Sequence, residues 1–153
     1  AKQARGPGFK GRIVRSGGPA EEEILQVAGK EASEGIYLYS PVGTDPTMTA
    51  FAQRYRKKYG AEMNSFTPAF YDSARMLLTG IEKAGSVTDT DAVAKAIEGL
   101  RDVAGVQGKL NWTGKAVYGL DRQVDAQFYV VQLRDGKKVP MARCNYSKCG
   151  ALE

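Results

Sequence analysis

The chain has 153 residues, a length that suffices for one domain with a hydrophobic core. Apolar residues make up 42% and charged residues 25%, and no run of about 18 apolar residues predicts a transmembrane helix. Histidine is absent, which excludes a Ser-His-Asp triad, a Cys-His pair and a His-ligated zinc site. Because a paired-carboxylate motif is also absent, we expect a protein that is not an enzyme and that holds no metal or cofactor.

The net charge of +5 comes from 22 Lys and Arg residues against 17 Asp and Glu residues. A basic excess can attract nucleic acid or anionic lipid. The densest cluster, "RYRKK" at 54–58, lies in the last turn of a predicted helix, where cations offset the negative end of the helix dipole. The other basic residues are scattered, so a nucleic-acid-binding module is the less favoured alternative and we expect no nucleic-acid partner.

The first forty residues predict a strand, a helix and a second strand. The opening stretch "AKQARGPGFK" lacks the apolar segment of a signal peptide, so we expect either a cytosolic protein or one whose leader has been removed. A short strand is expected around 13–14, and a helix follows, with Pro19 in its first turn and Gly29 at its end. The β-rich run at 35–40 predicts the second strand.

Three helices are predicted in the middle of the chain. The first runs from an Asp45 cap to Gly60. The second, "TPAFYDSARMLLTGIEKAG", is expected to start at a Thr67 cap and to end at Gly85, and the third runs over 90–100. The predicted buried face of the second helix consists of Phe70, Ala74, Leu77, Leu78 and Ile81.

Short strands and turns are predicted after residue 100. The run "QFYVVQLRDGKKVP" predicts a β-hairpin whose turn is the Asp-Gly pair at 135–136. Cys144 and Cys149 are the only cysteines; they are expected either to close a small disulfide loop, in an oxidising compartment, or to remain free thiols. The early alternation of strands and helices predicts an α/β fold with some parallel pairing, but the chain supplies too few strands to cover its amphipathic helices.

Several motifs in order resemble the type I periplasmic substrate-binding proteins that serve branched-chain amino acid ABC transporters. These motifs are "VAGKEASEGIYLYSP", "FAQRYRKKYG", "PAFYDSARMLLTGIEKAGS", "AVAKAIEGL", "VQGKLNW" and "QFYVVQLRDGK". The resemblance implies two Rossmann-like α/β lobes with a ligand cleft between them, of which this chain is the incomplete C-terminal portion. It places residues 1–40 in the second lobe, 41–112 in helices of the first lobe, and 113–153 in the return to the second lobe and its terminal hairpin.

The resemblance also suggests ligand-binding residues. The start of the helix at 67 faces the cleft in this family, so Phe70 and Tyr71 are expected to wall a ligand pocket and Asp72 to orient the ligand. The alternative is that Phe70 is core and that Asp72 is only an anion at a helix N-terminus. Trp112, near the last crossover, is expected to pack at the hinge.

A second set of candidates follows the first strand and includes the crossover. Ser16, Gly17 and Gly18 present backbone N–H groups where a helix begins, which suits an anion or a polar head group, although a tight helix entry explains the glycines equally well. Leucine-type members hold the ligand's ammonium group with an acidic residue at about the position of Gly17. Its absence here leaves room for a carboxylate without an amine. Tyr39 is expected in the crossover strand, where it contacts the cleft or packs.

The favoured function is therefore an extracytoplasmic solute-binding protein, periplasmic or extracellular, that captures an amino acid or an aromatic or organic carboxylate. Hinge closure would present the loaded form to an ABC transporter permease. A ligand-sensing receptor domain of the same fold is the alternative. The expected partners are the small-molecule ligand, the permease, and either the missing N-terminal part of the same protein or a second copy, because an isolated fragment would expose an apolar face.

Overall fold

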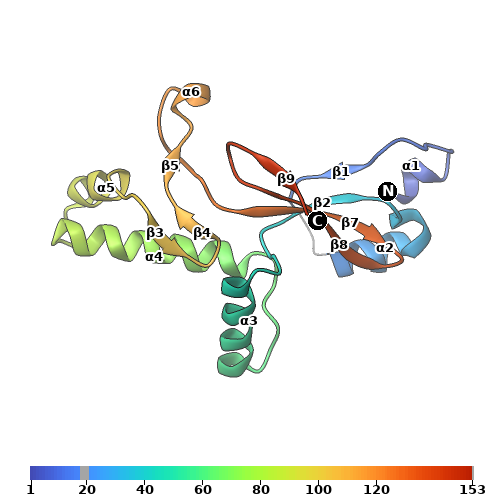
Figure 1. Cartoon of the computed structure of the whole chain (residues 1–153), viewed down its shortest axis with the longest axis horizontal. Coiled ribbons are helices and arrows are strands. Elements are labelled where there is room, and N and C mark those ends of the chain that lie inside the picture. The colour runs from blue at the N-terminus through green and yellow to red at the C-terminus, as the bar shows by residue number, and fades with distance from the viewer. Residues whose placement is uncertain (18–20, 153) are drawn as a thin grey trace. The chain divides into compact units, whose positions relative to one another are not determined.

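The computed structural model describes residues 1–17 and 21–152. The chain forms two compact units, coloured along the chain in Figure 1. Unit 1 comprises Ala1–Gly43 and Phe128–Glu153, and unit 2 comprises Thr44–Gln127. Within the described part of the chain, no helix combines the length and the apolar character needed to cross a membrane.

Unit 1 is built on a mixed five-stranded sheet in the order β1-β2-β7-β8-β9 (Figure 1). The first two strands run parallel, with Arg15 opposite Leu38, which confirms the predicted parallel pairing. The other neighbouring strands are antiparallel. The strands are β1 (Val14–Arg15), β2 (Tyr37–Ser40), β7 (Phe128–Arg134), β8 (Lys137–Cys144) and β9 (Cys149–Ala151).

The core of unit 1 follows from the alternation of side chains along β7. Every second residue of this strand is buried, because successive side chains point to opposite faces of a sheet. Ile13 and Ile24 pack against this buried cluster from outside the sheet strands. The cluster consists of Ile36, Leu38, Tyr129, Val131 and Leu133.

Helix α2 (Glu21–Ser33) corrects the prediction that Gly29 ends this helix. Gly29 has a φ of 78° and a ψ of 165°, so the helix is interrupted there but resumes and continues to Ser33. The Ser33 hydroxyl donates a hydrogen bond of 2.7 Å to the Gly29 carbonyl oxygen, which gives a partner to a carbonyl at the interruption. Pro19 lies outside the described residues. A short helix, α1 (Lys2–Arg5), precedes β1.

The terminal hairpin confirms its prediction. Asp135 and Gly136 join β7 to β8 with φ values of 52° and 72°, the pair of positive angles that an Asp-Gly turn of type I′ requires. Cys144 and Cys149 form a disulfide between β8 and β9, so of the two alternatives for these cysteines the bonded one is present.

An ion pair joins this turn to α2 and yields a testable pH effect. The Lys30 ammonium lies 2.6 Å from the Asp135 carboxylate. The hydrogen bond and the charge of Lys30 lower the pKa of Asp135 below its ordinary value of 3.8. A lowered pKa in the folded state means that the pair contributes stability above pH 3.8 and that this contribution is lost as the pH falls through the lowered pKa.

Replacement of Lys30 with alanine is therefore expected to raise the pKa of Asp135 toward 3.8, measured by NMR titration of the carboxyl carbon. Because both side chains are exposed, the midpoint of thermal unfolding should hardly change. Lys83→Ala, at an exposed lysine of unit 2, is the control and should leave the Asp135 titration as it is. If the pKa of Asp135 is the same in the parent chain and in the Lys30→Ala variant, the pair does not form in solution.

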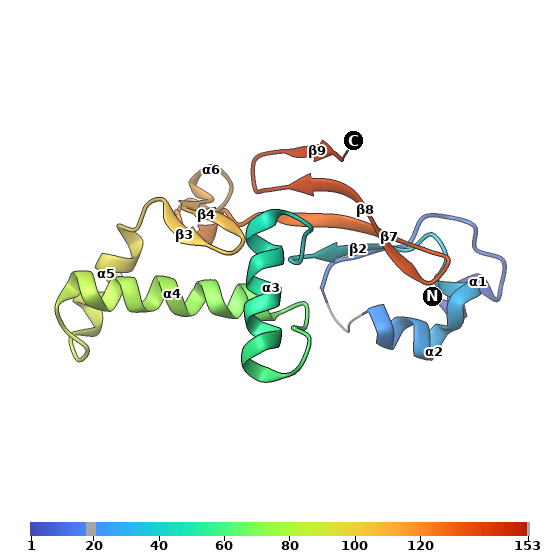
Figure 2. The same cartoon turned by 60° about the horizontal axis from the view of Figure 1, so that its bottom comes forward.

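Unit 2 contains three longer helices and two small two-stranded sheets (Figure 2). Helix α3 confirms its predicted ends: Asp45 Oδ1 accepts a hydrogen bond of 3.1 Å from the backbone N–H of Met48, and Gly60 ends the helix with a φ of 68°. The elements are α3 (Pro46–Tyr59), α4 (Thr67–Ala84), α5 (Thr90–Glu98), β3 (Val103–Gly105), β4 (Gly108–Leu110), β5 (Trp112–Thr113), α6 (Lys115–Tyr118) and β6 (Gln123–Val124).

The start of α4 differs from the prediction. Thr67 is the first helical residue and does not act as the cap. Asn64 Oδ1 accepts hydrogen bonds from the backbone N–H groups of Phe66 and Thr67, at 2.9 and 3.0 Å, so the capping oxygen comes from the preceding loop. Gly85 ends the helix with a φ of 66°, as predicted.

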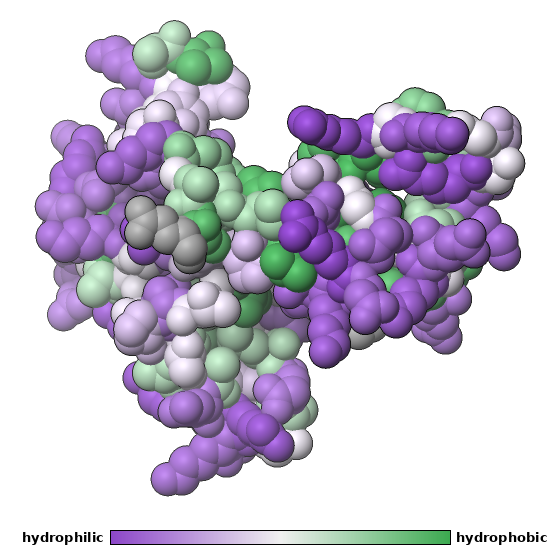
Figure 3. Space-filling model, turned by 45° about the vertical axis from the view of Figure 1, so that its right-hand side comes forward, coloured by the Kyte–Doolittle hydropathy of each residue, from purple (hydrophilic) through white to green (hydrophobic). Residues whose placement is uncertain are grey.

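The predicted buried face of α4 is wrong. The buried side carries Pro68, Asp72, Met76 and Gly80, spaced by four residues. In contrast, Phe70, Leu77 and Leu78 are 74%, 47% and 64% exposed. Helix α4 packs mainly against α5 and β3, and Phe70, Leu77 and Leu78 of its apolar stripe lie at the surface. On the face of the molecule shown in Figure 3, apolar residues reach the surface among hydrophilic ones.

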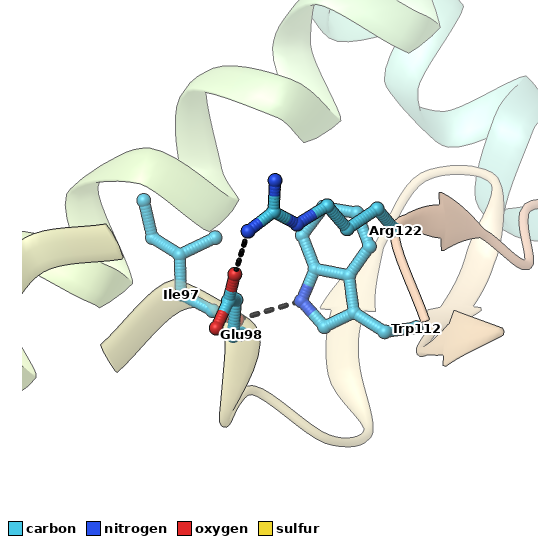
Figure 4. Close-up of polar contacts among 4 residues, drawn as sticks. All are labelled: Ile97, Glu98, Trp112 and Arg122. Atoms are coloured by element: carbon cyan, nitrogen blue, oxygen red, sulfur yellow. Dashed lines mark hydrogen bonds and ion pairs between the residues drawn. The ribbon is translucent and has the colours of Figure 1, made fainter. Parts of the chain in front are cut away.

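Trp112 connects α5 to the core of unit 2 (Figure 4). Its indole N–H donates a hydrogen bond of 2.6 Å to the carbonyl oxygen of Ile97, near the C-terminal end of α5, where backbone carbonyls lack helical partners. The neighbouring Glu98 pairs with Arg122 at 2.6 Å. Trp112 also packs on the core cluster of Met76, Leu100 and Leu110. The packing of Trp112 at the hinge between the two lobes stays a prediction.

Candidate functional site

A groove of about 690 Å³ lies between α3 and the start of α4, wholly within unit 2. Its volume falls in the range of about 300–1,000 Å³ that small-molecule sites occupy. Its lining is dominated by aromatic side chains and contains no acidic side chain among the described residues. The lining residues are Phe51, Arg54, Tyr55, Lys58, Tyr59, Asn64, Phe66, Thr67, Phe70 and Tyr71.

A continuous row of aromatic rings forms one wall of the groove. Phe51, Tyr55 and Tyr59 are four residues apart on α3 and therefore share one face of the helix. The ring centroids of Phe51 and Tyr55 are 6.5 Å apart, and those of Tyr55 and Tyr59 are 4.7 Å apart. Tyr71 of α4 joins the row, with its centroid 4.8 Å from that of Phe51. All three distances are typical of favourable tilted ring pairs.

Two cations lie beside this row of rings. Arg54 and Lys58 are also four residues apart, one position before Tyr55 and Tyr59. The Arg54 guanidinium carbon lies 5.9 Å from the centroid of the Phe51 ring, and the Lys58 ammonium lies 5.4 Å from that of Tyr59. Both distances allow cation–π attraction, which holds the two charges near the rings. Neither side chain is within ion-pair distance of a described acidic residue; the charged pair on this helix is Arg56 with Glu62.

The structure brings together two of the three residues expected at the start of α4. Phe70, 74% exposed, and Tyr71, 36% exposed, line the groove. An exposed aromatic ring leaves a large apolar surface in contact with water. The position of these two rings at the start of the helix therefore suits contact with a ligand. Whether they bind a ligand remains a prediction.

Asp72 lies on the other side of α4. It is buried, at 3% exposure, and its two carboxylate oxygens accept hydrogen bonds from the backbone N–H groups of Val106 and Gln107, at 2.8 and 2.9 Å. Burial raises the pKa of Asp72 above its ordinary value of 3.8, while these two hydrogen bonds and the charge of Arg75 act in the opposite direction. In this arrangement the carboxylate ties α4 to the turn between β3 and β4.

The second set of predicted residues belongs to unit 1. Ser16 and Gly17 are exposed directly after β1, and Gly17 has a φ of 71°. Because Arg15 pairs with Leu38 in parallel register, Ser16 and Tyr39 lie at the same end of two neighbouring strands. Gly18 lies outside the described residues.

Tyr39 has a packing partner and an accessible surface. It is 44% exposed, and its ring centroid lies 5.2 Å from that of Phe128. Burial raises the pKa of the Tyr39 phenol above its ordinary value of 10.0, so the group stays a neutral hydrogen-bond donor at physiological pH.

Several residues of the groove were not predicted from the sequence. The cluster containing Arg54 and Lys58 is explained from the sequence only by the helix dipole, and the sequence pattern does not single out Phe66. A signal was available: aromatic residues at 51, 55 and 59 and cations at 54 and 58 repeat with the same spacing of four. Two such rows on one helix predict a surface that is aromatic and positively charged. No described group of three or more Cys, Asp or Glu side chains is placed to hold a metal ion.

A family model described as "Periplasmic binding protein" matches residues 1–138. The chain belongs to the periplasmic binding protein family. Its partial, mixed α/β fold is that of the type I members, as the sequence resemblance predicted. None of the curated proteins matches the chain.

Solved structures of similar proteins support the same fold. A leucine-binding protein from Thermotoga maritima is 29% identical, with a TM-score of 0.73, and the match covers 95% of this chain and 40% of that one. A leucine-, isoleucine-, valine-, threonine- and alanine-binding protein from Brucella ovis is 19% identical, with a TM-score of 0.72, over 94% of this chain and 39% of that one. A solute-binding protein from R. palustris in complex with benzoate is 17% identical, with a TM-score of 0.57, over 84% and 34%. The chain thus spans about 40% of the length of the first of these relatives.

Proposed function

We propose that this chain is the ligand-contacting portion of an extracytoplasmic solute-binding protein that delivers a small molecule to an ABC transporter permease. The family membership supports a solute-binding role. The single observation that carries the proposal to this chain is the aromatic groove between α3 and α4, which is large enough for a small organic molecule and includes Phe70 and Tyr71. Binding and release, without chemical change of the solute, are sufficient for this role.

The proposed ligand is an amino acid or an aromatic or organic carboxylate. Similar proteins are described as binding leucine and other amino acids, and one is in complex with benzoate. The aromatic lining of the groove favours ligands with an apolar body. A second set of ligand contacts in the assembled protein is proposed for Ser16, Gly17, Gly18 and Tyr39. Asp72 lies on the other side of α4 from the groove and stabilises this helix through its hydrogen bonds.

The whole protein is proposed to act by hinge closure. Because the chain spans about 40% of the length of a similar leucine-binding protein, we assign the remaining contacts to an N-terminal part of the same protein or to a second copy. Residues 1–40 and 113–153 are assigned to one lobe and residues 41–112 to the other. Closure of the two lobes on the ligand would create the shape that the permease recognises.

A ligand-sensing receptor domain of the same fold is the alternative function. It would bind the same solute but pass the signal to an attached domain. Transport assays with the intact gene separate the two: loss of uptake on deletion supports the import role, and unchanged uptake with a lost transcriptional or motile response supports the sensor.

Isothermal titration calorimetry of the 153-residue chain with a panel of amino acids and aromatic carboxylates tests solute capture. Because the groove is formed entirely by residues 51–71, this chain alone is expected to bind at least one panel member. Phe70→Ala should weaken that binding about tenfold, while Phe9→Ala, at an exposed ring of unit 1, should not change it. Absence of binding across the panel would contradict the proposal.

A further inference from the structure

The charges of the groove between α3 and α4 are all of one sign. Its two charged lining residues are Arg54 and Lys58, and no described acidic side chain lines it. Asp72, the acidic residue nearest to the groove in sequence, is buried on the other side of α4 and accepts hydrogen bonds from Val106 and Gln107. Glu62 follows the helix but pairs with Arg56 at 3.2 Å. The groove therefore has donors for an anion and has no carboxylate for an ammonium group.

Cation–π contacts keep the two positive charges of the groove close to its aromatic rings. Arg54 and Lys58 each lie within 6 Å of a ring centroid on the same helix, at Phe51 and Tyr59. Because Arg54 and Lys58 are four residues apart, they lie on the same side of α3, and both charges border the same groove. The rings of Tyr55, Phe66 and Phe70 remain available to the apolar body of the same molecule, since they are half-buried or exposed.

We infer that the groove selects an aromatic anion without an ammonium group, with its ring among the aromatic side chains and its negative charge held by Arg54 and Lys58. This inference rests on the proposed solute capture and adds the class of ligand and the residues that determine it. A zwitterionic amino acid would place its ammonium group against two cations, which disfavours it relative to the anion.

The test uses matched probes of one shape. Phenylacetate, its neutral amide phenylacetamide and L-phenylalanine share the ring and differ in charge. We expect phenylacetate to bind about tenfold more tightly than either of the others, and we expect its affinity to fall as ionic strength rises. Arg54→Gln and Lys58→Gln should each weaken phenylacetate binding about tenfold and leave phenylacetamide binding unchanged.

Lys57→Gln is the matched control. Lys57 is exposed on the same turn of α3 but does not line the groove, so its replacement removes the same charge from the helix. Phenylacetate binding should be retained in this variant. All three side chains are exposed, and the far-UV circular dichroism of each variant should match that of the parent chain.

The possible outcomes separate this inference from the proposed function. Equal binding of phenylacetate and phenylacetamide, or full phenylacetate binding in both Arg54→Gln and Lys58→Gln, would overturn the charge selectivity while solute capture stands. Preferred binding of L-phenylalanine would also overturn it and would favour an amino acid ligand. If none of the three probes and no member of the wider panel binds, both proposals fail.

Discussion

Replacing Asp72 with asparagine is expected to lower the free energy of unfolding by about 2 kcal/mol or more. Both carboxylate oxygens of Asp72 accept hydrogen bonds from backbone N–H groups, those of Val106 and Gln107. An asparagine offers one oxygen and one NH2 group, so one backbone N–H would face another donor in a buried site. The expected effect exceeds that of losing a single exposed hydrogen bond because the unpaired group remains out of water.

Chemical denaturation followed by tryptophan fluorescence measures this effect. Trp112 is the only tryptophan, and it lies in unit 2 together with Asp72. Glu82→Gln makes the same chemical change at an exposed position of α4 and should alter stability by no more than about 0.5 kcal/mol. Equal midpoints for the two variants would contradict the role of Asp72 as the tie between α4 and the β3–β4 turn.

The space around the Asp72 carboxylate is also limited. A Cβ atom at Gly105 would lie 2.7 Å from an oxygen of Asp72 and 2.8 Å from a methyl carbon of Leu110. Such approaches are closer than real Cβ contacts, so the glycine allows β3 to approach α4. This close approach is a second reason why Asp72 is buried while Phe70 and Tyr71, on the other side of the helix, are not.

Replacing Trp112 with alanine is expected to cost about 2–3 kcal/mol of the free energy of unfolding, less than the 3–5 kcal/mol of a fully buried aromatic residue because Trp112 is half-buried. The substitution removes the packing on Met76 and Leu110 and the hydrogen bond to the Ile97 carbonyl. Trp112→Phe keeps most of the packing and should cost only about 1 kcal/mol, the net value of one hydrogen bond.

Far-UV circular dichroism must follow this unfolding, because the substitution removes the fluorescent residue. Tyr118→Ala, at a 61% exposed aromatic residue of α6, is the control and should be nearly neutral. If Trp112→Phe costs as much as Trp112→Ala, the hydrogen bond to Ile97 dominates and the packing contribution has been overestimated. If both variants are neutral, Trp112 does not support α5.

Local signals predicted the ends of α3 and the terminal hairpin. Asp45 and Gly60 act through neighbours within four residues, and the Asp-Gly turn at 135–136 depends on its own backbone angles. The partner of Asp72 could not be predicted in this way, because Val106 and Gln107 are more than 30 residues away in the sequence. The family resemblance provided the fold class, which the family match confirms.

The wrong buried face of α4 has a physical cause. Phe70, Leu77 and Leu78 form an apolar stripe that a second layer could bury, and hydrophobic periodicity reports such a stripe whether or not the layer is in the chain. In this chain, the described residues pack on the side of Met76 and Gly80 instead. For the candidate site, the family resemblance suggested Phe70 and Tyr71. Arg54 and Lys58 were missed because their positions near the end of a helix already had an explanation in the helix dipole.

Native mass spectrometry of the purified chain shows directly whether the chain captures a solute. After incubation with the panel of aromatic carboxylates and amino acids, the 16.6 kDa chain is expected to carry the added mass of one small molecule, which disappears when the same sample is denatured. Phe70→Ala should reduce the fraction that carries this mass. A bare 16.6 kDa species under every condition would contradict the claim that this chain takes part in binding a solute.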